Sequence, residues 1–154
     1  MSVDEKLITP IFCIRMNKKE KKKMTTEEKL EILSKYKYVP HYIDERFNGR
    51  QAREIRLGFE KGLKVEDVLF YANYELKAEV MEEIRLGLEN GLSIEKISIY
   101  AKPEFTEEQM MELRFALEDG LKIEDVKAIA DMRYDPEHMR EIRIGIKNEI
   151  LGRK

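Results

Sequence analysis

The chain has no tryptophan, one cysteine, two histidines and four prolines in its 154 residues. Cys13 has no second cysteine with which to form an internal disulfide, which is typical of a protein from a reducing compartment. Neither His41 nor His138 has Cys, Asp or Glu at metal-ligand spacing with another histidine, so no zinc site is predicted. We therefore expect neither a metal nor another cofactor.

Long apolar runs are also missing. None approaches the ~18–20 residues needed to span a bilayer. The N-terminus, MSVDEKLITP, places acidic residues before any apolar stretch, unlike a secretory signal. These features predict a cytoplasmic protein that does not use the membrane as a partner.

Motifs for catalysis are equally scarce. The sequence contains no GxxxxGK[ST] or GxGxxG phosphate-binding loop and no HExxH helix. Cys13 has no identifiable base near it in the sequence. The many carboxylates recur at regular positions, as expected for a solvated helix surface. The sequence therefore predicts a protein that is not an enzyme, with no catalytic residues.

Charge is abundant and unevenly distributed. Residues 1–53 carry 13 Lys and Arg against 8 Asp and Glu, a net +5. Residues 54–137 carry 11 against 21, a net −10, and residues 138–154 carry 5 against 2, a net +3. An acidic centre between basic ends favours partners of opposite charge.

A strict internal repeat of 29 residues dominates the sequence. EIRLGFEKGL at 54–63 returns as EIRLGLENGL at 83–92 and as ELRFALEDGL at 112–121. Repeats of this length are typical of stacked helical units, each of which cannot bury its apolar face alone.

Each repeat predicts a longer helix followed by a shorter one. The longer helix is expected to start after the capping positions Asn48, Lys77, Thr106 and Asp135. Its expected stops, where glycine tolerates a positive φ, are Gly62, Gly91 and Gly120. Apolar residues at i, i+3 and i+7 predict the shorter helices near residues 65–72, 94–101 and 123–130. Upstream, Thr25 and Glu28 form a predicted capping box.

Three recurrent positions bear on packing. The first is always apolar and lies on the side opposite the main apolar face: Leu57, Leu86, Phe115 and Ile144. We expect both sides of the long helix to be buried, one against its own short helix and the other against a neighbouring repeat. The second, in mid-helix, holds Gly58, Gly87, Ala116 and Gly145. Because glycine costs a helix ~1 kcal/mol relative to alanine, this position predicts a close backbone approach between helices. The third holds methionines predicted to fill the core: Met81, Met110 and Met139.

An arginine two residues before the mid-helix position is also periodic. Arg56, Arg85 and Arg114 each precede a glutamate at i+4, whereas Arg143 precedes Lys147. Because acids accompany the first three arginines, we expect salt bridges rather than a phosphate-binding row.

These patterns together predict an all-α protein, a short solenoid-like stack of 29-residue helix pairs with a small N-terminal extended or β segment. Residues 1–24 form an appendage with a basic run, residues 25–46 a degenerate capping-helix region, and residues 47–154 about three and a half repeats. The fourth repeat has a long helix but no short-helix pattern after it, as expected for an atypical terminal cap.

The segments QMMELRFALEDGL and VMEEIRLGLENGLSIEKISIYAKPEF resemble a recurrent pattern, roughly QM-x-x-IR-x-GLE-x-GL…YA-x-P-x-F. This pattern is found in uncharacterised helical-repeat proteins of gut-type Gram-positive bacteria, their phages and conjugative elements. The likeness covers about residues 47–150 and departs at Val80 for Gln, Ala116 for Gly and Ile129 for Tyr. It implies a mobile-element setting, in which small non-enzymatic proteins often inhibit host defence nucleases.

The favoured function is a protein-binding module whose acidic surface meets a basic partner, such as the nucleic-acid channel of a nuclease in the manner of an anti-CRISPR protein. The candidate contacts are Glu66, Glu82, Glu95, Asp119, Glu124 and Asp125.

Two alternatives remain open. A nucleic-acid-binding accessory protein would use the basic ends, with candidate contacts at Lys18, Lys19, Lys21, Lys22, Lys23, Arg140 and Arg143. A structural homo-oligomer would pair its N-terminal segment between chains. The acidic centre favours the protein-binding module over the nucleic-acid-binding protein.

Overall fold

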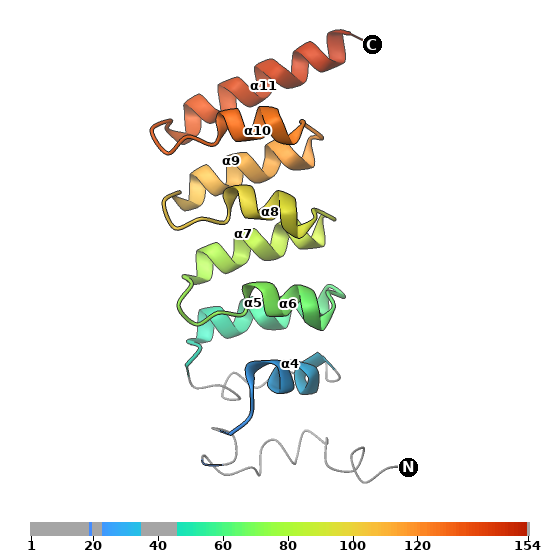
Figure 1. Cartoon of the computed structure of the whole chain (residues 1–154), viewed down its shortest axis with the longest axis vertical. Helices are drawn as coiled ribbons and strands as arrows, with labels where there is room; N and C mark the ends of the chain where they lie inside the picture. The colour runs from blue at the N-terminus through green and yellow to red at the C-terminus, as the bar shows by residue number, and fades with distance from the viewer. Residues whose placement is uncertain (1–18, 20–22, 35–45, 154) are drawn as a thin grey trace. The chain divides into compact units, whose positions relative to one another are not determined.

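The computed structural model describes residue 19 and residues 23–34 and 46–153. Within these residues the chain is all-helical, with no strand, which confirms the predicted class. The helices labelled in Figure 1 are α4 (Thr26–Ser34), α5 (Gly49–Glu60), α6 (Val65–Tyr71), α7 (Ala78–Glu89), α8 (Ile94–Tyr100), α9 (Glu107–Glu118), α10 (Ile123–Ile129) and α11 (Pro136–Gly152). The predicted extended or β segment, Cys13 and His41 lie outside the described residues.

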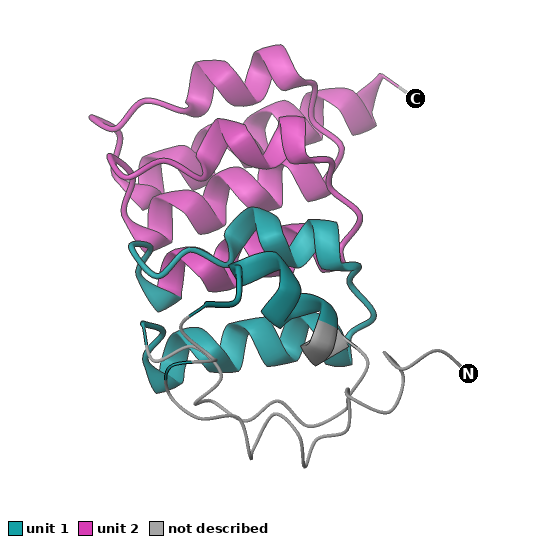
Figure 2. Cartoon of the chain, turned by 60° about the horizontal axis from the view of Figure 1, so that its bottom comes forward, with its two compact units in different colours: residues 1–78 teal, residues 79–154 magenta. Residues whose placement is uncertain are grey.

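The chain divides into two compact units (Figure 2). Unit 1, residues 1–78, holds α4, α5 and α6, which pack against one another. Unit 2, residues 79–154, holds α8 to α11 and nearly all of α7. In unit 2 the long helix α9 packs against α8, α10 and α11, and α10 also packs against α8 and α11.

Helix starts follow the predicted capping chemistry. The Asn48 side chain accepts the N–H of Gln51 at 2.9 Å, and the Gln51 side chain accepts the N–H of Asn48 at 2.8 Å. Thr106 and Gln109 repeat this reciprocal box at the start of α9. Each glutamine also donates from its amide to two carbonyls of the connection that follows the next short helix: Tyr74 and Leu76 for one, Met132 and Tyr134 for the other. Each glutamine therefore also links the start of its long helix to the connection at the end of the same repeat.

Three long helices stop where the sequence predicts. Gly62, Gly91 and Gly120 have φ values of 86°, 82° and 82°. The chain then turns back, and the next N–H bonds a carbonyl in the preceding turn, as in Leu92 to Gly87 at 2.9 Å. Glu149 occupies the corresponding position of α11, and this helix runs on through 17 residues to Gly152.

The core is built from the periodic apolar positions. Met81, Met110 and Met139 are at most 1% exposed, which confirms their role as core filler. The second apolar side of the long helices is less buried than predicted. Leu57, Leu86 and Phe115 are half-buried, and Ile144 is 44% exposed. The second side is therefore partly exposed to solvent, and only the first belongs to the core.

The mid-helix glycines do not mark a backbone contact, so that prediction was wrong. A Cβ at Gly58 would lie 2.1 Å from the Tyr71 hydroxyl, and one at Gly87 would lie 2.2 Å from the Tyr100 hydroxyl. Each hydroxyl donates at 2.9 Å to the carbonyl four residues before the glycine, that of Glu54 or Glu83. The glycine therefore makes room for a buried phenol from the following short helix.

The third repeat exchanges both members of this pair. Ala116 stands where the earlier repeats have glycine, and Ile129 stands where they have tyrosine. Both side chains are buried. Because isoleucine has no hydroxyl to reach the helix backbone, the added methyl of alanine fills space that the phenol would otherwise need.

Candidate protein-binding surface

The first turn of each short helix presents a glutamate to solvent. Glu66 begins α6 in unit 1, and Glu95 and Glu124 begin α8 and α10 in unit 2, each as the second residue of its helix. All three are exposed, and none has an ion pair or side-chain hydrogen bond within the described residues. A carboxylate here is favoured by the helix dipole, but its charge remains available to a partner.

The other three acidic candidates differ in how much of their charge is free. Asp125 is half-buried in the first turn of α10, beside Glu124. Glu82 lies 4.0 Å from Arg85 Nη2 with a half-exposed side chain. Asp119 is taken up inside unit 2, because it accepts from Arg143 at 2.9 Å and from Lys147 at 2.8 Å. The six acidic candidates are therefore not all free to bind a partner.

A row of buried ion pairs runs between the long helices of unit 2. Arg114 on α9 donates to Glu83 on α7 at 2.8 Å and to Glu118 of its own helix at 2.8 Å. The predicted i, i+4 pairs are present here, in Arg85 to Glu89 at 2.6 Å, and in unit 1 in Arg56 to Glu60 at 3.6 Å. The partner on the neighbouring long helix was not predicted.

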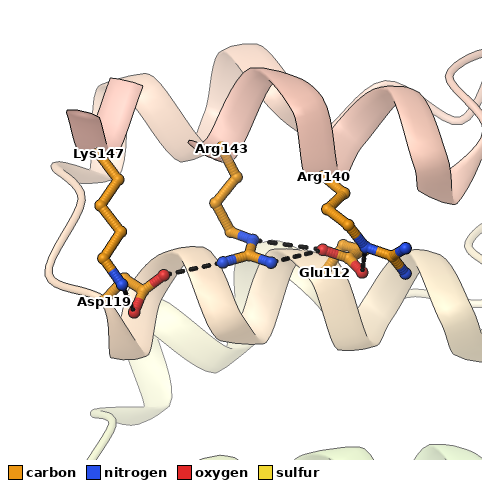
Figure 3. A network of polar contacts seen from close by, with 5 residues as sticks. All are labelled: Glu112, Asp119, Arg140, Arg143 and Lys147. Carbon is orange, nitrogen blue, oxygen red and sulfur yellow. Dashed lines mark hydrogen bonds and ion pairs between the residues drawn. The ribbon is translucent and has the colours of Figure 1, made fainter. Parts of the chain in front are cut away.

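The same geometry recurs between α9 and α11 (Figure 3). Glu112, 2% exposed, accepts from Arg143 at 3.1 and 3.2 Å and from Arg140 at 2.9 Å. Arg143 and Lys147, the like charges that stand in the fourth repeat where the others have an arginine and a glutamate, meet at the carboxylate of Asp119.

At the edge of this row the charges of the contacting side chains differ between repeats, and the two partners of a contact differ together. Asn90 directly follows α7, at the repeat position that Asp119 occupies after α9, and its amide donates to Glu118 at 2.9 Å. In the next contact Lys147 on α11 corresponds to Glu118, and Asp119 corresponds to Asn90. A carboxylate thus meets an amide in one repeat contact and an ammonium in the next.

Burial and ion pairing shift the pKa values of these groups in opposite directions. Burial raises the pKa of Glu83, and the hydrogen bond from Arg114 only partly offsets it. Desolvation would lower the pKa of Arg114, but hydrogen bonds to Glu83 and Glu118 outweigh it and the pKa is raised. At Asp119 desolvation would raise the pKa, but the hydrogen bonds from Lys147 and Arg143 together outweigh it, so the pKa is lowered.

The basic candidates are distributed differently from the acidic ones. Arg140 and Arg143 are held by Glu112, and the Arg143 side chain is 14% exposed. Lys19 and Lys23 are exposed, while Lys18, Lys21 and Lys22 lie outside the described residues. The arginines predicted for nucleic acid are therefore committed to intramolecular pairs.

Sequence reasoning missed the buried glutamates of this row. Glu83 and Glu112 lie two residues before the recurrent arginine, at a position that is glutamate in all four repeats: Glu54, Glu83, Glu112 and Glu141. That invariance within the chain was the available signal. The arginine that each binds is 31 residues further on, which periodicity alone does not reveal.

Within the described residues no group of three or more His, Cys, Asp and Glu side chains is arranged to hold a metal ion. None of the helices described combines the length and apolarity needed to cross a membrane. Comparison of the chain with protein-family models, curated proteins and solved structures found no match.

Proposed function

We propose that the chain is a non-enzymatic, cytoplasmic protein-binding module whose repeats form a short α-solenoid. In this proposal the short helices supply an acidic row that a basic partner surface recognises. In unit 2 the long helices, linked by buried ion pairs, supply the scaffold that positions Glu95 and Glu124. The architecture favours this role because stacked helix pairs present an extended surface rather than a closed pocket.

One observation carries the proposal. Glu66, Glu95 and Glu124 occupy the same place in three successive repeats, are exposed, and have no partner among the described residues. Arg140, Arg143 and Asp119, by contrast, are engaged in ion pairs within unit 2. The first turn of each of the three short helices thus carries an acidic charge without an internal partner.

The partner proposed is a basic, nucleic-acid-binding nuclease. Carboxylates at regular spacing can stand in for phosphates in a channel lined by Lys and Arg. The resemblance to repeat proteins of phages and conjugative elements favours a host defence nuclease, in the manner of an anti-CRISPR protein.

Charge reversal tests this proposal directly. The variant Glu66→Lys/Glu95→Lys/Glu124→Lys removes the acidic row. The matched control, Glu75→Lys/Glu104→Lys/Glu137→Lys, changes the same charge at exposed positions outside the short helices. Affinity capture from a natural host, followed by mass spectrometry, should recover a basic nuclease with the wild-type chain and with the control but not with the row variant.

The captured nuclease is then purified and assayed for cleavage with each of the three chains. We expect inhibition by the wild type and the control and at least tenfold weaker inhibition by the row variant. Equal inhibition by all three chains would refute the acidic row as the binding surface. A captured protein with no nuclease activity would refute the proposed partner class.

The nucleic-acid alternative makes an opposite prediction. If the lysines at 18, 19 and 21–23 bind phosphates, duplex DNA or RNA should bind the chain with an affinity that falls steeply with salt. A gel shift at low salt, with those five lysines changed to glutamine as the control, distinguishes the two functions. No shift at low salt would dispose of this alternative.

A further inference from the structure

Helix α11 exposes the face that the preceding long helix buries. In α9 the residues that are buried are Gln109, Met110, Glu112, Leu113, Arg114, Ala116 and Leu117. At the same seven positions of α11 only Met139 is buried. Ile142 and Ile146 are half-buried there, and Glu141 and Gly145 are exposed. No short helix follows α11 among the described residues.

The repeats themselves indicate what covers such a face. Around Gly87 the covering atoms come from the Tyr100 hydroxyl, the Ile97 side chain and the Leu92 side chain. Around Gly58 they come from Tyr71 and Leu63. A short helix with a β-branched residue three positions before a tyrosine therefore fits over a long helix that has glycine at this place.

Glycine and tyrosine change together within the chain, which makes Gly145 informative. Repeats with glycine have tyrosine on the covering helix, and the repeat with Ala116 has Ile129. Gly145 keeps the glycine, and nothing lies within 4 Å of where its Cβ would be. The slot for a tyrosine hydroxyl, and the Glu141 carbonyl that would accept from it, are both present.

A charged group beside the slot adds a second requirement. Glu83 and Glu112 each bind an arginine of the next long helix. Glu141 is the corresponding residue of α11, and it is exposed and without a partner among the described residues. A partner that docks here is thus best matched if it also carries a basic side chain, which in the repeats comes from the next long helix rather than from the short helix with the tyrosine.

We propose that α11 is a docking site for a helix of a partner protein, with the pattern apolar-x-x-apolar-x-x-Tyr. The tyrosine lies over Gly145, its hydroxyl donates to the Glu141 carbonyl, and the apolar residues cover Ile142 and Ile146. A second copy of the chain does not supply this helix from its described residues, because Tyr71 and Tyr100 are fully buried in their own units. The inference is independent of the acidic row, and either can fail alone.

The chain's own α8 provides the probe. A capped synthetic peptide of residues 90–104 carries Ile94, Ile97 and Tyr100 in the required pattern. We expect it to bind the full chain saturably, measured by fluorescence anisotropy, with NMR shift changes concentrated in α11. The peptide variant Tyr100→Phe, which lacks only the hydroxyl, should bind about fivefold more weakly.

Exchange of the glycine gives the sharpest comparison. The wild-type chain should prefer the tyrosine peptide to a Tyr100→Ile peptide, and a Gly145→Ala chain should reverse that preference, as the third repeat does internally. A Gly152→Ala chain, altered on the same helix outside the slot, should behave as the wild type. Misfolding cannot produce a reversal of preference.

Several results would overturn the proposal. They are the absence of saturable binding up to the solubility limit of the peptide, an unchanged preference in Gly145→Ala, and NMR shift changes confined to α7. Self-association of the chain that Ile146→Lys abolishes would show that a second copy occupies the face instead.

Discussion

Replacing Gly87 by alanine tests whether this glycine makes room for the buried ring of Tyr100. The new Cβ would lie 2.2 Å from the Tyr100 hydroxyl, so the ring must move. Tyr100 is fully buried and donates at 2.9 Å to the Glu83 carbonyl. A shift of the ring therefore disturbs packing and breaks a buried hydrogen bond together.

The magnitude follows from three opposing contributions. Alanine should stabilise helix α7 by about 1 kcal/mol relative to glycine. Overpacking around the ring should cost about 2 kcal/mol, and loss of the hydroxyl's hydrogen bond about 1 kcal/mol. We expect Gly87→Ala to lower the free energy of unfolding by about 2 kcal/mol, against the sign that helix propensity alone would give.

A double-mutant cycle isolates the contact. In a Tyr100→Ile background, which copies the Ala116 and Ile129 pair, Gly87→Ala should stabilise by about 1 kcal/mol because only helix propensity remains. The coupling energy is then about 3 kcal/mol, at the upper end for residues in contact. Urea unfolding followed by far-UV circular dichroism measures it, provided that the m-value is unchanged. A coupling below about 0.5 kcal/mol would refute the reasoning.

Three further predictions concern α9 and α11. Gly145→Ala, unlike Gly87→Ala, should stabilise the chain by about 1 kcal/mol in urea unfolding, because nothing lies within 4 Å of its Cβ position; destabilisation would mean that the slot is already filled. Glu112→Gln should cost about 2 kcal/mol in the same assay, because it removes the charge that Arg140 and Arg143 share; an unchanged midpoint would contradict a structural role for this carboxylate. Asp119→Asn should destabilise the chain at neutral pH by about 0.5 kcal/mol. Because its pKa is lowered from 3.8 in the folded state, Asp119 contributes stability above that value and loses it as the pH falls through the lower folded pKa. The thermal unfolding curves of wild type and Asp119→Asn should therefore converge in acid, and a constant difference would contradict the pairing.

The sequence was sufficient for the helices because their determinants are local. A capping box joins residues three apart, as Thr106 and Gln109 do, and a glycine stop needs only the φ of one residue. Repetition at 29 residues then displayed these signals several times, so each was reinforced by its copies. The i, i+4 arginine–glutamate pairs were predictable for the same reason.

The candidate site was only partly predictable. The exposed glutamates of the short helices could be proposed from their position in the first turn. That Asp119 is neutralised by Arg143 and Lys147 could not, because those contacts join residues 24 and 28 apart on different helices. Charge on a sequence does not reveal whether a carboxylate faces solvent or a cation of the next helix.

By itself, then, the sequence determined the helix boundaries and the 29-residue repetition. The tertiary structure decided why Gly58 and Gly87 must lack a side chain. A missing Cβ admits either a backbone or a side chain, and only the position of the following short helix shows that a tyrosine hydroxyl enters. The same packing decided that Glu83 and Glu112 lie in the interior, because their burial depends on an arginine from the neighbouring long helix.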